Sequence, residues 1–138
     1  MVACKAKQNT VTYPTAWPEP SLAAPQDAIP ADLGMLADGK PAKGKTNFTW
    51  TTPKGTQMWQ VGFTSNESFR QMGSEYERVL TQAGYKAKWE GNHPSVTFIR
   101  IKDGVKRRIV FAYYEYPPFP RLGLKTHYEL LIQDYPQH

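Results

Sequence analysis

The sequence predicts an α+β fold in which one amphipathic helix packs on an antiparallel sheet of about five to six strands. Three observations support this prediction. One stretch near the middle of the chain has helical periodicity, segments with alternating apolar residues lie on both sides of it, and turn sequences join those segments. A Pro-rich irregular segment precedes them. We therefore expect a tether and irregular segment over residues 1–45 and a single α+β domain over residues 46–138.

The N-terminal third of the chain is predicted to lack regular structure. Six of the 12 prolines lie between residues 14 and 41. Each proline removes an amide donor and pushes the residue before it toward an extended conformation. Apolar residues such as Trp17, Leu22 and Leu33 are too frequent for a purely solvated linker. Parts of this segment should therefore wrap onto the domain that follows.

A hairpin and a helix are predicted next. The stretch "TNFTWTTPKGTQMWQVGFTS" over residues 46–65 alternates on both sides of a Pro-Lys-Gly turn, which predicts two strands. Apolar residues then recur at spacings of three, four and seven, which predicts a helix with one buried face. These residues are Phe69, Met72, Tyr76, Val79, Leu80 and Ala83. Ser65 or Asn66 can cap the start of the helix, and Gly84 can end it.

The rest of the chain is predicted to form strands. "GYKAKWE" suits a short strand, and "SVTFIRIK" and "VKRRIVFAYYEY" flank an Asp103-Gly104 turn. The stretch "LGLKTHYELLIQ" alternates strictly, so its apolar residues should share one side of a strand. The residues on that side are Leu124, Thr126, Tyr128, Leu130 and Ile132. This alternation predicts that His127 faces solvent.

The only cysteine, Cys4, can be interpreted in two ways. The simpler interpretation is a free thiol in a frayed terminus. However, the first four residues, "MVAC", resemble the lipobox of bacterial lipoproteins, in which apolar and small residues precede a cysteine that becomes diacylated. The resemblance implies a lipidated Cys4 and a protein anchored in the bacterial cell envelope, facing the periplasm or the cell surface. The charged and apolar regions of a signal peptide are missing here, as expected if the printed chain begins just before the cysteine.

A second resemblance covers about a quarter of the chain. The segment "SFRQMGSEYERVLTQAGYKAKWE" is similar to part of small bacterial envelope proteins, in which a helix ends in a Leu-x-x-x-Gly-aromatic turn and leads into an antiparallel sheet. Leu80, Gly84 and Tyr85 match this turn. Such domains serve as lipoproteins, accessory factors and immunity proteins. The resemblance therefore implies a structural motif and no catalytic residue.

No arrangement of residues predicts catalysis. His93 lies in an Asn-His-Pro turn, His127 on a predicted strand and His138 at the C-terminus, without the spacing of metal ligands or of a catalytic triad. The helix glutamates Glu67 and Glu75 precede arginines by three residues, which is typical of a solvated face. We therefore expect no enzyme activity, no cofactor and no metal, although residues distant in sequence could still converge.

The formal net charge of +5 draws attention to one predicted hairpin. Its arms carry Arg100, Lys102, Lys106, Arg107 and Arg108, and pairing around Asp103 should bring these charges to one end. Two interpretations stand. The charges can keep an exposed edge soluble, or they can attract an anionic partner such as lipid head groups, an acidic glycan or an acidic protein. Nucleic acid is disfavoured, because the net charge is modest and no binding motif is present.

Aromatic residues predict a second candidate surface. The stretch "AYYEYPPFPR" places tyrosines on alternate faces of a strand, so they cannot all lie in one core layer. Tyr114, Tyr116, Phe119 and Arg121 could form a protein-binding patch, because tyrosine and arginine are favoured interface anchors. Packing beneath the Pro-rich segment is an equally good interpretation.

Together these observations predict a non-catalytic envelope lipoprotein that acts as a binding or structural component of an envelope assembly. Its expected partner is another envelope protein, with the membrane contacted through lipidated Cys4. The alternative is a periplasmic immunity or inhibitor protein that blocks a toxin or enzyme. An enzyme that acts on cell-wall or lipid substrates is the third and weakest possibility.

Overall fold

The computed structural model describes residues 17–91, 94–114 and 126–136. One helix packs against a seven-stranded antiparallel sheet, which confirms the predicted α+β class with one strand more than the upper prediction. The elements are β1 (Ile29–Pro30), β2 (Asn47–Thr51), β3 (Gln57–Ser65), α2 (Phe69–Gln82), β4 (Lys86–Glu90), β5 (Ser95–Lys102), β6 (Val105–Tyr114) and β7 (Thr126–Pro136).

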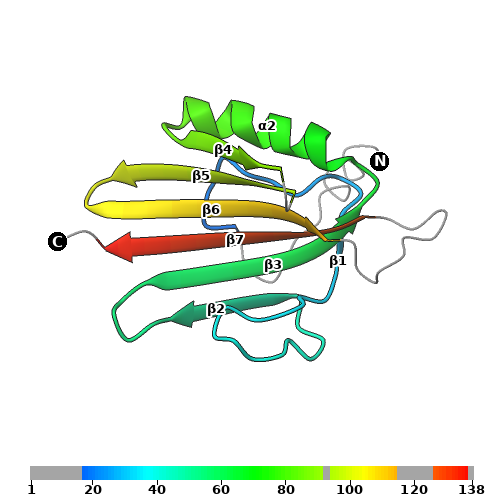
Figure 1. Cartoon of the computed structure of the whole chain (residues 1–138), viewed down its shortest axis with the longest axis horizontal. Helices are drawn as coiled ribbons and strands as arrows, with labels where there is room; N and C mark the ends of the chain where they lie inside the picture. The colour runs from blue at the N-terminus through cyan, green and yellow to red at the C-terminus, as the bar shows by residue number, and fades with distance from the viewer. Residues whose placement is uncertain (1–16, 92–93, 115–125, 137–138) are drawn as a thin grey trace, which may run out of the picture.

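The sheet is built mainly from neighbouring hairpins. Its strand order is β1-β3-β7-β6-β5-β4, and β2 pairs with β3 on the same side as β1 (Figure 1). The additional strand is β1, whose two residues come from the Pro-rich segment and pair with Thr64 and Phe63. The predicted turn at Asp103-Gly104 joins β5 and β6, and both turn residues have positive φ, as a tight two-residue hairpin requires.

The helix begins and ends with capping motifs. Its N-cap is Ser68, whose hydroxyl accepts a hydrogen bond from the Gln71 amide, so the prediction of Ser65 or Asn66 was wrong. Ser65 is buried and donates to Asp27 instead. At the other end Gly84 has a φ of +98°, and the Tyr85 amide bonds back to the Leu80 carbonyl at 2.9 Å. This is the αL termination that glycine permits.

The predicted apolar stripe of α2 packs on the sheet. Met72, Tyr76 and Leu80 are buried, and Phe69, Val79 and Ala83 pack at their edges. We call the side of the sheet that carries α2 the helix face. Residues 17–28, the N-terminal arm, extend this layer beyond the helix: Trp17 packs edge-on against Trp59 with ring centroids 5.8 Å apart.

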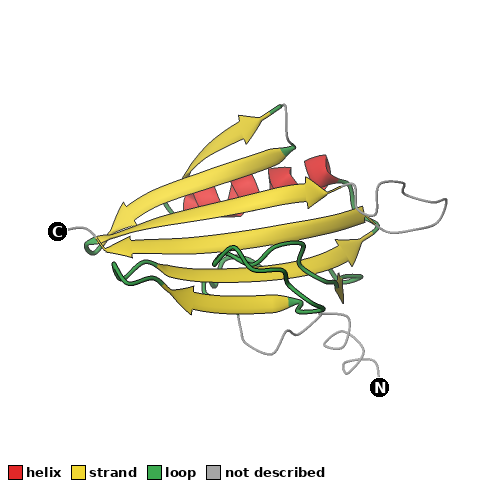
Figure 2. Cartoon of the chain, turned by 60° about the horizontal axis from the view of Figure 1, so that its bottom comes forward, coloured by secondary structure: helices red, strands yellow, loops and turns green. Residues whose placement is uncertain are grey.

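The other side of the sheet is only partly covered. Residues 31–45, which we call the strap, cross β3 on this side and bury a small second cluster made of Leu33, Leu36 and Ala42. Figure 2 shows α2 behind the sheet and the strap in front of its lower strands. The Gln60 side chain fastens the strap, because it accepts from the Ala37 amide at 2.6 Å and donates to the Met35 carbonyl at 3.1 Å. We call this side the open face.

Candidate binding surfaces

The predicted basic hairpin forms, but its charges separate onto two faces. Side chains alternate along each strand, and the buried Phe98 and Ile109 show which residues of β5 and β6 point toward the helix face. Arg100, Lys102 and Arg107 therefore lie on the helix face, whereas Lys106 and Arg108 lie on the open face. The hairpin does not present its five cations as one patch.

The two arginines on the helix face belong to a largely buried ion cluster. Glu19 of the N-terminal arm, whose side chain is 4% exposed, lies 3.8 Å from an Arg100 nitrogen and 3.5 Å from an Arg107 nitrogen. Arg107 also makes a two-pronged ion pair with Asp134, with contacts of 2.6 and 2.8 Å. The Tyr85 hydroxyl donates to Glu19 at 2.5 Å. Arg100 and Arg107 thus fasten the N-terminal arm to the sheet.

The charges in this cluster stabilise one another. Burial raises the pKa of Glu19, but hydrogen bonds from Tyr85 and Ser21 and the charge of Arg100 outweigh it, so the pKa lies below 4.5. Burial, followed by the hydrogen bond to Glu19, raises the pKa of the Tyr85 hydroxyl. The hydrogen bond to Asp134 raises the pKa of Arg107. Glu19 therefore stays ionised and Tyr85 stays protonated at neutral pH.

The open face carries an uncovered basic patch beside the strap. Lys86 on β4, Ile99 on β5 and Arg108 on β6 lie side by side across the sheet. Two residues further along β6, Val110 lies opposite Leu131 on β7. We define the open-face patch as Lys86, Lys88, Ile99, Lys106, Arg108, Val110 and Leu131. Its lysines on β4 are exposed, and its three apolar side chains are half-buried. Figure 2 shows the strap in front of the lower strands of the sheet and no described segment in front of β5 and β6. Arg108 is held in place by a hydrogen bond that it donates to the side-chain amide oxygen of Gln133 at 2.7 Å.

Several predicted site residues lie outside the described residues. Cys4, Tyr116, Phe119 and Arg121 are among them, so the lipidation site and most of the predicted aromatic patch stay predictions. Tyr114 is the last residue of β6, and the position of its side chain is not described.

The described histidine, His127, is buried, although strand alternation places it on the open face. His127 pairs with Tyr114 on β6 and Thr64 on β3, and it is only 7% exposed, so the prediction of an exposed residue was wrong. Within residues 17–91, 94–114 and 126–136, no group of three or more His, Cys, Asp or Glu side chains could hold a metal ion.

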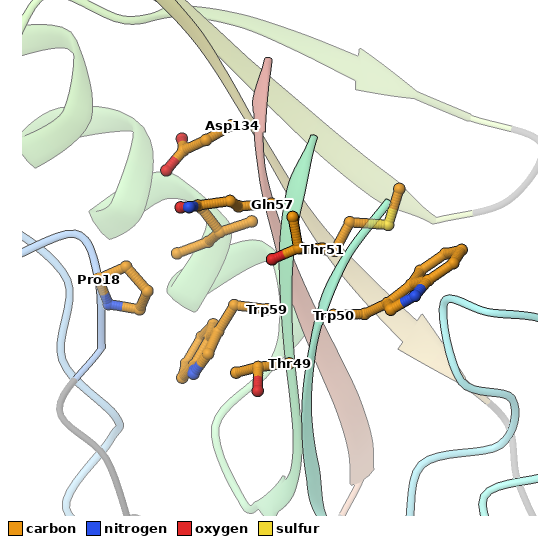
Figure 3. Close-up of a pocket in the computed structure, with 9 residues that line it drawn as sticks. Pro18, Thr49, Trp50, Thr51, Gln57, Trp59 and Asp134 are labelled. Atoms are coloured by element: carbon orange, nitrogen blue, oxygen red, sulfur yellow. The ribbon is translucent and has the colours of Figure 1, made fainter. Parts of the chain in front are cut away.

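A pocket of about 370 Å³ opens on the helix face beside β2 (Figure 3). Trp59 and Ile132 provide apolar walls, and the polar side chains around them include Gln57. The complete lining is Pro18, Thr49, Trp50, Thr51, Gln57, Met58, Trp59, Ile132 and Asp134. The Asp134 carboxylate is already bound by Arg107. The lining therefore mixes apolar and polar side chains and contains no free acid–base pair.

Sequence reasoning missed the open-face patch and the pocket for the same reason. Both combine residues from strands that are distant in sequence, such as Lys86 with Arg108 and Thr49 with Ile132. One signal was available, because the alternation along "VKRRIVFAYY" already separates Arg107 from Arg108. Glu19 gave no signal of its role, since it is a single acid among prolines.

No helix within the described residues is long and apolar enough to cross a membrane. Comparison with known proteins finds no matching family model, no matching curated protein and no matching solved structure.

Proposed function

We propose that this protein is a non-catalytic lipoprotein of the bacterial cell envelope, anchored through Cys4, that binds an acidic protein partner on its open-face patch. The composition of that patch carries the proposal. Lys86, Lys88, Lys106 and Arg108 surround the half-buried apolar residues Ile99, Val110 and Leu131. An apolar centre with a charged rim is the usual anatomy of a protein interface.

The charge balance of the patch favours an acidic partner. Of the acids nearby, Glu90 pairs with Lys88 at 3.7 Å, and Glu129 accepts a hydrogen bond from the Gly34 amide of the strap at 2.9 Å. Lys86, Lys106 and Arg108 have no ion pair with a described acid. Complementary charge on a partner would speed association and fix its orientation.

The binding site is tested by reversing its charge. The double variant Lys86→Glu with Arg108→Glu changes the patch, whereas Arg70→Glu with Lys40→Glu makes the same change in net charge at exposed positions elsewhere. The full chain is used to capture partners from envelope extract, and captured proteins are quantified by mass spectrometry. A protein that is retained by wild type and the control pair, but lost with the patch variant, is the expected result. Equal capture by all three would contradict the proposal.

The anchor is tested separately. With a signal peptide placed before it, the chain should incorporate labelled fatty acid and fractionate with membranes, and Cys4→Ser should abolish both. Equal labelling of the Cys4→Ser chain would refute the lipoprotein assignment. The alternative function, inhibition of a toxin or enzyme, uses the same surface, and the identity of the captured protein decides between the two.

A further inference from the structure

The β5–β6 turn exposes two apolar side chains between lysines. Ile101 is 66% exposed and Val105 is 37% exposed, which places both among the exposed large hydrophobic residues of the described chain. Ile101 pairs with Lys106, and Lys102 pairs with Val105. We name residues 101–106 the hairpin tip. We propose that the hairpin tip inserts into the head-group region of an anionic lipid bilayer.

The positions of the apolar pair favour a bilayer over a protein partner. Ile101 belongs to the open face and Val105 to the helix face, because strand alternation places them on opposite sides of the hairpin. A partner lying flat on either face would cover only one of them. A bilayer interface surrounds an inserted tip and can therefore bury both side chains at once.

The surrounding charges fit an anionic surface. Lys102 and Lys106 flank the two apolar residues, and Lys54 lies in the β2–β3 turn at the same end of the sheet (Figure 1). Asp103 is the one acid in the tip. Lysine can keep its ammonium group among lipid phosphates while its aliphatic stem lies along the apolar layer.

The chain also enters the described domain at this end of the sheet. Arg107, next to the hairpin tip, donates a hydrogen bond to the Pro18 carbonyl at 3.2 Å. Cys4 lies 14 residues before Pro18, so a lipid on Cys4 could be at most about 50 Å from Pro18 along a fully extended chain. The anchor and the hairpin tip could then contact the same membrane. The contribution of a Cys4 lipid depends on the proposed function, whereas membrane insertion itself is inferred from the residues of the hairpin tip.

The first experiment measures vesicle binding without the lipid. The full chain carrying Cys4→Ser is sedimented with vesicles of phosphatidylglycerol and phosphatidylethanolamine, and with vesicles of phosphatidylcholine alone. With the wild-type hairpin tip, the Cys4→Ser chain should bind the vesicles that contain phosphatidylglycerol and should not bind those of phosphatidylcholine alone. Lys102→Gln with Lys106→Gln should weaken binding by about fivefold for each lysine. Ile101→Ser with Val105→Ser should weaken it by about tenfold.

Two control variants test whether a loss of vesicle binding is specific to the hairpin tip or follows from removing any exposed apolar or charged side chain. Ile29→Ser removes a side chain that is 53% exposed at the opposite end of the sheet, and Lys40→Gln with Lys45→Gln removes two charges from the strap. Both controls should bind the anionic vesicles as tightly as the Cys4→Ser chain with an unchanged tip. No binding to anionic vesicles, or an equal loss in controls and tip variants, would overturn the inference. Tip variants that keep vesicle binding but lose a captured protein would instead assign the tip to the protein interface.

A second measurement does not depend on the stability of the tip variants. In the Cys4→Ser chain, an environment-sensitive fluorophore is attached through Ile101→Cys or, as the control, through Ile29→Cys. Anionic vesicles should shift the emission of the tip label to shorter wavelength and leave the control label unchanged. An unshifted tip label on bound protein would mean that another surface meets the membrane. Neither measurement requires the lipid or the protein partner, so failure here leaves the proposed function standing.

Discussion

Replacing Gly62 by alanine should weaken the packing of the strap on the sheet. Gly62 lies in β3 beneath the strap, and its backbone makes two hydrogen bonds to the two ends of the strap: it accepts from the Ala31 amide at 3.0 Å and donates to the Thr46 carbonyl, next to Lys45, at 2.9 Å. A Cβ at this position would lie 2.6 Å from the Ala31 carbonyl oxygen and 3.3 Å from a Leu33 methyl group. A carbon and an oxygen in ordinary contact are about 3.3 Å or more apart. The strap must therefore lift by about 0.7 Å.

The cost follows from what the strap loses when it lifts. Forcing an additional methyl group into a packed site costs about 1 to 3 kcal/mol. A weakened backbone hydrogen bond adds about 1 kcal/mol. Alanine has less conformational freedom than glycine in the unfolded chain, which offsets about 0.4 to 1 kcal/mol of this cost. The expected loss is about 1 to 3.5 kcal/mol in the free energy of unfolding, which is a fall of several degrees in Tm for a domain of this size.

Urea denaturation followed by tryptophan fluorescence measures this loss, with Gly34→Ala as the control. Gly34 also lies in the strap, its φ is not in the left-handed region, and a Cβ there would be 3.9 Å from its nearest neighbour, a Glu129 oxygen. The control should stay within about 0.5 kcal/mol of wild type. A Gly62→Ala protein as stable as wild type would show that the strap does not pack on β3 as described.

Three further predictions concern the core and the acidic residues Glu19 and Glu129. Leu80→Ala should cost roughly 2 to 5 kcal/mol, because Leu80 is fully buried between α2 and the sheet; an unchanged Tm would show that the helix does not dock there. The pKa of Glu19 is lower in the folded protein, so its stabilising contribution is present above about pH 4.5 and is lost as the pH falls through the folded pKa. Glu19→Gln should therefore flatten the acid side of the stability profile between pH 7 and pH 3, and a profile parallel to wild type would contradict this. Burial raises the pKa of Glu129 despite the hydrogen bond from the Gly34 amide, so its stabilising contribution is present at low pH and is lost as the pH rises through the folded pKa. Glu129→Gln, which keeps the acceptor for Gly34, should raise the unfolding free energy at pH 7 and leave it unchanged at pH 3; a destabilised variant at pH 7 would refute the assignment.

Local patterns in the sequence determined the α+β class, the helix and the turns of the hairpins. The spacing of Met72, Tyr76 and Leu80 is sufficient to define a buried helix face, and Asp103-Gly104 is sufficient to define a tight turn. These features depend on backbone preferences and on apolar periodicity within a few residues. Each can therefore be read from one short segment.

The tertiary structure alone decided which charges are available to a partner. Arg100 and Arg107 belong to the same basic run as Lys106 and Arg108 in the sequence, but Glu19, more than 80 residues away, holds the first two in a buried cluster. The extra strand, the Ser68 cap and the burial of His127 likewise depend on neighbours that the local pattern does not contain. Strand alternation assigns a side chain to one of two faces, and only the packing of the N-terminal arm, α2 and the strap determines which parts of those faces stay open.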